Sequence, residues 1–184
     1  MIEFRAIDDS RTTITELMIP AYANFGGKVH GGVILSLMDK VAYACASQHA
    51  GTYCVTASVD AVDFRGPVEV GDLVHLKASV NYVGRTSMEI GIRTESHNIQ
   101  TGERRHTNTS YFTMVAMGEA GSPVPVPGLI LETELDVRRF LEGMKRRELA
   151  RTYRDAYQQA KSIGEITVEL HQLEGKRCRV DWEG

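Results

Sequence analysis

The sequence predicts an α+β fold in which one long helix packs against a mostly antiparallel sheet of about five to six strands. Two observations support this prediction. A glycine-rich turn at residues 25–32 leads into an apolar stretch of helical length at residues 33–49. Four strand-like runs follow with only short turns between them, and short turns join antiparallel neighbours because parallel strands need long crossover connections.

The elements up to the end of the helix are bounded by proline and glycine. Residues 11–19 contain several β-branched side chains and predict a first strand, which Pro20 ends because proline cannot donate to the hydrogen-bonded ladder. A loop of small residues leads to the helix. Gly51 is its expected end, because glycine readily adopts the left-handed conformation found just after helices.

Turn residues also separate the strands that follow the helix. These strands are expected at residues 53–64, 72–83, 87–97 and 106–117. Apolar and polar side chains alternate from Val74 to Val80, and again from Met88 to Ile92. Because successive side chains of a strand point to opposite faces, one face of each strand should be buried. We therefore expect the helix to pack on this sheet.

The composition changes after the proline-spaced stretch at residues 122–128. Residues 132–155 contain seven basic and six acidic side chains, with apolar residues at helical spacing. This pattern predicts an amphipathic helix whose apolar side packs on the body of the protein or on a partner chain. We expect one domain over residues 1–130, and a helical extension and tail over residues 131–184. Residues 165–182 form either a small hairpin turning near Glu174-Gly175 or a loose tail.

Length, composition and charge limit the class of protein. The 184 residues point to one domain with an appended segment, and a hydrophobic content of 42% is enough for a core. No stretch approaches the roughly 18 apolar residues of a membrane span, and the charged start has no signal-peptide core. We expect a cytoplasmic protein without a membrane partner. The net charge of −3 gives no general attraction for nucleic acid.

Several common site motifs are absent from the sequence. Cys45, Cys54 and Cys178 are widely spaced and form no CxxC pair, which argues against a disulfide framework or a structural zinc site. The sequence contains neither a GxSxG nor an HExxH motif, and no two histidines are four residues apart on one helix. We therefore expect no metal.

One acid, Asp39, stands inside the apolar helix. Burying an unpaired carboxylate is costly, so such a group is usually paired, at the surface or functional. The polar residues of the helix form one stripe: Ser36, Lys40, Tyr43 and Ser47. At about 100° per residue, Asp39 lies roughly 70° from the middle of this stripe, which predicts that it borders the solvated face. It is either an ordinary acid at a helix margin or a functional group.

The residues before the helix favour the functional interpretation. His30-Gly31-Gly32 stands where the helix begins, and glycines there let a ligand approach unpaired backbone N–H groups. Those donors, together with the helix dipole, suit an oxyanion. With the carboxylate of Asp39 and the amide of Asn24, they make a minimal set of groups for hydrolysing an ester or thioester without a serine triad.

Three motifs occur in a specific order along residues 10–130. They are AN…GGKVHGGVILSLMD, VTASVDAVDFRGPVEVGD and VGRTSMEI. Together they resemble the acyl-CoA thioesterases of the hotdog fold, in the YciA and cytosolic brain-type acyl-CoA hydrolase branch. The resemblance implies a long helix wrapped by an antiparallel sheet. It also implies hydrolysis of acyl-CoA to fatty acid and CoA, with no cofactor beyond the coenzyme A of the substrate.

The resemblance also implies roles for individual residues. Asp39 is expected as general base or nucleophile, and Asn24 as the amide that orients water or substrate. An amide of Gly31, Gly32 or Val33 is expected to hold the carbonyl oxygen. The segment VGRTS nominates three residues that contact CoA: Arg85, Thr86 and Ser87. Arg93, on the following strand, is a weaker candidate for neutralising phosphate charge.

The spacing of these residues predicts a site shared by two chains. Asp39 follows Gly31 by eight residues, so it lies about 12 Å further along the helix axis. One carboxyl side chain cannot cover that distance. An antiparallel second chain could bring its Asp39 to the first chain's Asn24, and the resemblance implies the same. We expect a homodimer that assembles further, with a trimer of dimers as one arrangement.

Two alternatives remain open from the sequence. A non-catalytic sensor of acyl-CoA on the same fold would need neither Asp39 nor Asn24 and would usually carry a DNA-binding segment, but the charge-balanced extension shows no recognition helix. A hydratase or dehydratase on this fold needs a catalytic histidine with a carboxylate partner. His30 is the only candidate for that role, and no acid follows it closely.

Overall fold

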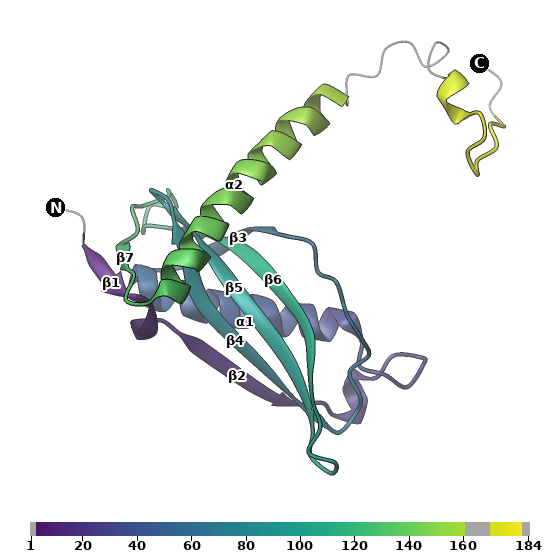
Figure 1. Cartoon of the computed structure of the whole chain (residues 1–184), viewed down its shortest axis with the longest axis horizontal. Coiled ribbons are helices and arrows are strands. Elements are labelled where there is room, and N and C mark those ends of the chain that lie inside the picture. The colour runs from purple at the N-terminus through teal and green to yellow at the C-terminus, as the bar shows by residue number, and fades with distance from the viewer. Residues whose placement is uncertain (1–2, 161–169, 182–184) are drawn as a thin grey trace. The chain divides into compact units, whose positions relative to one another are not determined.

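The computed structural model describes residues 3–160 and 170–181. Figure 1 shows the order of the elements along the chain. They are β1 (Phe4–Ala6), η1 (Ile7–Asp9), β2 (Thr12–Leu17), η2 (Pro20–Tyr22), α1 (Gly31–Ala50), β3 (Cys54–Val59), β4 (Asp72–Val83), β5 (Ser87–Asn98), β6 (Arg104–Ala116), β7 (Gly128–Ile130), α2 (Glu134–Ala160) and η3 (Leu170–Leu173).

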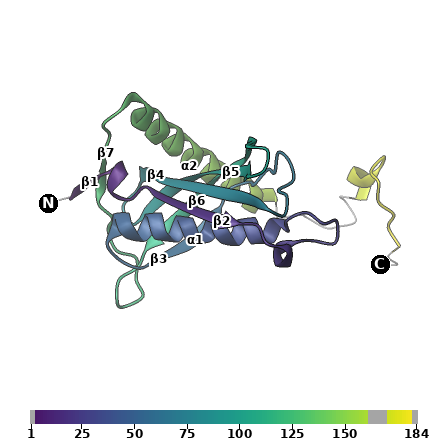
Figure 2. The same cartoon turned by 90° about the horizontal axis from the view of Figure 1, so that it is seen from below.

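The main sheet has five strands in the order β2-β4-β5-β6-β3, and every neighbouring pair is antiparallel. Helix α1 runs along one face of this sheet (Figure 2). The alternating side chains of β4, β5 and β6 that face α1 are fully or almost fully buried, for example Leu76, Ile90 and Phe112. Burying each such side chain contributes about 1.5–3 kcal/mol. This architecture confirms the predicted fold.

Helix α1 begins two residues before the predicted start. His30 is its N-cap and Gly51 its C-cap, with a φ of 70° that favours glycine. The predicted end at Gly51 is therefore confirmed.

Strand β3 is shorter than predicted. The prediction extended it to residue 64, whereas the strand ends at Val59 after a register irregularity between Thr56 and Ser58. The chain then follows β6 only through isolated hydrogen bonds, such as the one from Asp60 N to Tyr111 O at 3.0 Å.

Strands β1 and β7 were not predicted. They form a separate two-stranded parallel sheet, in which Phe4 pairs with Gly128 and Ala6 with Ile130. Each strand has three residues, which is too short to show an alternating pattern.

The first turns of α2 pack on the other face of the main sheet, which confirms the predicted helical extension. The ring of Phe140 lies 5.0 Å from that of Tyr82. Gly143 is buried, and a Cβ atom there would lie 2.7 Å from Tyr82 Cβ and 2.9 Å from Glu89 Oε1. Only glycine therefore allows this helix to approach the sheet so closely.

The chain divides into two compact units, Met1–Met144 and Lys145–Gly184. The predicted division into residues 1–130 and 131–184 stays a prediction. In the second unit the large apolar residues of α2, such as Tyr153, are exposed.

Residues 170–181 contain η3 and no strand. The remainder of the predicted hairpin, residues 165–169 and 182, lies outside the described residues. None of the helices in the described part of the chain is long and apolar enough to cross a membrane.

Candidate active site

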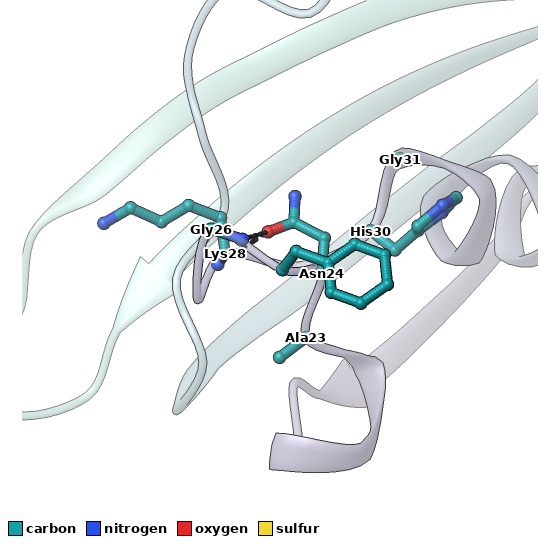
Figure 3. A pocket seen from close by; sticks show the side chains of 7 residues that line it. Ala23, Asn24, Gly26, Lys28, His30 and Gly31 are labelled. Carbon is teal, nitrogen blue, oxygen red and sulfur yellow. Dashed lines mark hydrogen bonds between the residues drawn. The ribbon is translucent and has the colours of Figure 1, made fainter.

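The loop before α1 is closed by the side chain of Asn24. Its Oδ1 atom accepts hydrogen bonds from Gly26 N at 2.8 Å and from Lys28 N at 3.2 Å, and its backbone N–H donates to Lys28 O at 2.7 Å. Figure 3 shows this oxygen directed at the turn. The amide nitrogen of Asn24 donates no hydrogen bond within the described residues, so the NH₂ group is available to a ligand.

The start of α1 leaves one of the three candidate amides unpaired. His30 Nδ1 accepts from Gly32 N at 2.9 Å, and His30 O accepts from Val33 N at 2.9 Å. Within the described residues, only Gly31 N has no partner among the three. The cap requires an unprotonated Nδ1, so the neutral ring carries its hydrogen on Nε2. The sequence suggested His30 only as the catalytic histidine of a hydratase or dehydratase and did not predict that it caps the helix.

A pocket of about 800 Å³ opens in front of this turn (Figure 3). It is lined by residues 23–26 together with Lys28, His30 and Gly31. The two residues with a free donor, Asn24 and Gly31, thus line the same pocket. A second pocket of about 560 Å³ continues along α1 past Ser36 to Lys40. The geometry suits an electron-rich oxygen held at the helix start, where the dipole is positive.

Asp39 is exposed on the surface of α1 and is held by one hydrogen bond. Thr56 on β3 donates its hydroxyl to Asp39 Oδ1 at 2.5 Å. No ion pair is made by Asp39 in the part of the chain that the structure describes. The prediction that Asp39 borders the solvated face was wrong. Leu35, on one side of Asp39, is exposed, whereas the hydroxyl oxygen of Ser47, on the other side, is buried. The exposed face of α1 is therefore centred near Asp39 and not on the predicted polar stripe.

Thr56 was missed in the sequence. It is close to Asp39 only because β3 lies beside α1, and the register of β3 on β6 turns this side chain toward the helix. No local pattern connects the two residues, which are 17 positions apart.

A single chain does not bring all the candidates together. Asp39 and Gly31 lie on the same helix, about 12 Å apart along its axis. The turn of Arg85, Thr86 and Ser87 lies at the other end of β4 from the Asn24 loop. Lys28 pairs with Glu69 just before β4 begins, whereas the turn follows the end of that strand. The twelve residues of β4 span about 40 Å.

Arg93 points away from all these groups. Residues Met88, Ile90 and Ile92 face α1, so Arg93 lies on the outer face of β5. Its Nε atom is 2.7 Å from Glu95 Oε1, and Lys77 Nζ is 2.6 Å from Glu95 Oε2. The hydrogen bonds from Lys77 and Arg93 hold the pKa of Glu95 at about 2. The structure thus places Arg93 in an ion-pair cluster, apart from the other site residues.

The edge of the main sheet beside Asp39 is unpaired in the single chain. Strand β3 bonds to β6 on one side and to no strand of the described residues on the other. Several large apolar side chains on and around it are exposed, and four of them are exposed by 39% to 44%: Leu35, Tyr43, Val59 and Phe64. Unpaired edges bordered by exposed apolar groups are surfaces on which another chain can pair.

The cysteines and metal ligands form no second centre in the described residues. Cys45 and Cys54 are buried, and Cys178 is exposed. Burial raises the pKa of the Cys45 thiol to about 12, which makes it unreactive. No group of three or more His, Cys, Asp or Glu side chains among the described residues could hold a metal ion.

Comparison with known proteins gives consistent matches. The family model of the thioesterase superfamily matches residues 26–102. "Protein VdlD" of Helicobacter pylori is 45% identical over 142 residues, which are 77% of this chain and 81% of the relative. "Uncharacterized acyl-CoA thioester hydrolase YkhA" of Bacillus subtilis is 36% identical over 73% of this chain and 78% of its own. The rat cytosolic acyl coenzyme A thioester hydrolase is 34% identical, but this chain spans only 38% of its length.

Solved structures agree with these relatives. A crystal structure of an apo-hexameric acyl-CoA thioesterase has a TM-score of 0.79 and 41% identity, covering 84% of this chain and 99% of the other. An acyl-CoA hydrolase from Staphylococcus aureus, bound to coenzyme A, has a TM-score of 0.81 and 27% identity over 87% of this chain and 96% of the other. Structures of this hydrolase include alanine mutants of one asparagine, one aspartate and one threonine.

Proposed function

Because this chain belongs to the thioesterase superfamily, we propose that it hydrolyses acyl-CoA thioesters to a free fatty acid and CoA. The enzymatic class is that of the relatives, which are acyl-CoA thioester hydrolases by name. The observation that carries the proposal is that this chain has both an exposed, hydrogen-bonded carboxylate at Asp39 and an unpaired backbone amide at Gly31.

In this proposal the turn before α1 binds the thioester carbonyl. The carbonyl oxygen accepts a hydrogen bond from Gly31 N–H at the positive end of the helix dipole, and this interaction strengthens as negative charge develops on the oxygen. The NH₂ group of Asn24 lines the same pocket and orients the water or the carbonyl. Gly32 and Val33 support the turn, since their N–H groups are already used by His30.

Asp39 supplies the base or nucleophile. Thr56 fixes its Oδ1 atom, and Oδ2 is left to take a proton from water or to attack the carbonyl carbon. On either route one water is consumed, the C–S bond breaks, and the CoA thiolate leaves and takes up a proton. The two routes differ only in whether an acyl-aspartate forms on the way.

Two copies of the chain complete the site. The exposed apolar residues around the unpaired edge of β3 lie beside Asp39 and Thr56, and pairing of this edge with a second β3 would cover them. A two-fold axis there reverses the direction of α1 in the second copy. Asp39 of one copy then approaches Asn24 and Gly31 of the other.

The CoA portion belongs near Arg85, Thr86 and Ser87. These residues lie about 40 Å from the Asn24 loop of their own chain, and the same reversal brings them toward the pocket of the second copy. Arg93 stays the weaker candidate for phosphate charge, because it pairs with Glu95 on the outer face of β5, apart from the other proposed residues.

The spacing of residues in a relative supports the assignment. The mutated asparagine, aspartate and threonine of the S. aureus hydrolase are separated along that chain by the same numbers of residues as Asn24, Asp39 and Thr56 are here.

A hexamer is known for another relative, and we propose that dimers of this chain assemble further, with a trimer of dimers as one arrangement. No cofactor is proposed besides the coenzyme A of the substrate. A cytoplasmic location is also part of the proposal and is supported by the cytosolic relatives.

The test is release of free CoA from acyl-CoAs by the wild type, by Asp39→Ala and by Asn24→Ala. Asp39→Ala should lower turnover by about a hundredfold or more, without loss of folding by circular dichroism. An Asp39→Ala enzyme as active as the wild type would reject the assigned base.

Mixing the two variants tests the shared site. When the chains are unfolded and refolded together in equal amounts, half of the dimers contain one intact site, so about a quarter of wild-type activity should return. No recovery in dimers shown to be mixed would mean that each chain holds a complete site.

A further inference from the structure

Phe25 has a greater relative accessibility, 114%, than any other large apolar residue of the described part of the chain. It stands between Asn24 and Gly26 at the tip of the loop before α1. A phenyl ring held in water is unfavourable, because apolar surface gains free energy when it leaves water. The exposure of this ring therefore indicates that it contacts another molecule.

The loop that carries Phe25 is held by hydrogen bonds and an ion pair. Asn24 Oδ1 accepts from the N–H groups of Gly26 and Lys28, Gly27 N donates to Asn24 O at 3.0 Å, and Ala23 pairs with Val29. Lys28 Nζ is 2.7 Å from Glu69 Oε2. The backbone at Phe25 is thus fixed while its side chain has no apolar support, as in a contact prepared for a ligand.

The ring lies in the pocket where the proposed reaction takes place. Phe25 lines that pocket together with Asn24 and Gly31. Its Cα atom is about 3.8 Å from that of Asn24, so the parts of the substrate nearest to the ring are those on either side of the thioester carbonyl. Two parts of the substrate are that close: the first carbons of the acyl chain, and the amide-bearing arm that leads to CoA. The adenine ring lies at the far end of that arm.

We propose that Phe25 is a specificity-determining residue that binds the acyl chain of the substrate. The inference rests on the proposed function. An apolar ring with no polar group matches the apolar acyl chain and not the amides of the other arm. Each methylene that it removes from water should contribute roughly fourfold to binding. The enzyme is then selective for acyl chains long enough to cover the ring, and acetyl-CoA gains nothing from it.

The experiment compares kcat/KM for acetyl-, butyryl-, octanoyl- and dodecanoyl-CoA in four proteins. They are the wild type, Phe25→Ala, Phe25→Leu and Phe4→Ala. Phe25→Ala should lose about tenfold or more with octanoyl- and dodecanoyl-CoA and less than threefold with acetyl-CoA. Phe25→Leu, which keeps apolar bulk, should recover most of the loss. Phe4 is also exposed, by 59%, but lies on β1, so Phe4→Ala should leave the profile unchanged.

Other results would overturn the inference. An equal loss at every chain length would place the ring against the CoA arm, and no loss at any length would mean that it contacts no substrate. A smaller assembly of Phe25→Ala in size-exclusion chromatography, compared with Phe4→Ala, would place the ring against a second copy. A wild type that releases no CoA from any of the four substrates would instead reject the proposed function, so the two failures are distinguishable.

Discussion

The face that the main sheet presents to α1 is apolar at one end and polar at the other. Under the later half of the helix, where the Cys45 thiol lies against the Val80 backbone, the strands present Ile90 and Phe112. Under the first half, the same strands present four polar residues that are all fully buried: Thr94, Ser96, Asn108 and Ser110. The hydroxyl oxygens of Thr94, Ser96 and Ser110 have no hydrogen-bond partner among the described residues.

Stability and the candidate site thus depend on different ends of the same helix. The apolar strand residues stabilise the later half of α1 by burial, whereas the buried strand hydroxyls without partners cost free energy under the first half. The polar end lies below the turns that begin at Gly31, and the amide of Asn108 lies 3.9 Å from Met38 Sδ, next to Asp39. The candidate site therefore lies at the end of α1 where the sheet provides less apolar burial.

The largest effect on stability should come from the apolar end. Ile90→Ala should lower the free energy of unfolding by about 2–5 kcal/mol, because it removes buried carbon atoms and leaves a cavity. Urea unfolding followed by circular dichroism measures it. Thr94→Ala is the matched control, since Thr94 lies on the same face of β5 further toward the polar end. If both variants lost the same free energy, the two ends would not differ.

A smaller effect, this time on activity, should come from Thr56. Thr56→Val keeps the shape of the side chain but removes the hydrogen bond to Asp39, and kcat/KM should fall about tenfold. Stability should change little, because Thr56 is exposed. Thr13→Val, at an exposed position of β2, is the control. Equal kinetics of the two variants would show that Thr56 does not position the carboxylate.

The smallest effect should come from the polar end itself. Thr94→Val replaces a buried hydroxyl that has no partner by a methyl group, so the free energy of unfolding should stay the same or rise by up to about 1 kcal/mol. Ile90→Val, which deletes one methyl group at the apolar end, should lower it by about 0.5–1.5 kcal/mol. A clear loss in Thr94→Val would mean that the hydroxyl is paired in solution.

Much of the fold could be predicted because its signals are local. Strand β4 matched its predicted range, since Gly71 precedes it and its side chains alternate between the two faces. Strand β5 alternates in the same way, and this alternation shows which face Arg93 lies on. The prediction for Arg93 did not use it. With Met88, Ile90 and Ile92 facing α1, an odd-numbered residue of β5 has to face outward.

The site could be predicted only in part, because some of its contacts join distant elements. The carboxylate, the amide and the glycine turn follow from residue type and position along the helix. The contact from Thr56 depends on the register of β3, and the selection of Gly31 depends on the ring orientation of His30. Neither is visible in a local pattern. The position of Asp39 in the middle of the exposed face was missed because Leu35 is exposed beside it.

Gly143 has a consequence for telling related proteins apart. The backbone of α2 touches Glu89 and Tyr82 there, and even a methyl group would collide with them. A relative with the same reactive groups but an alanine at this point would have to lift its last helix from the sheet. A glycine at this position is thus a marker for related proteins whose C-terminal helix packs on the sheet as in this chain, whatever reaction they catalyse.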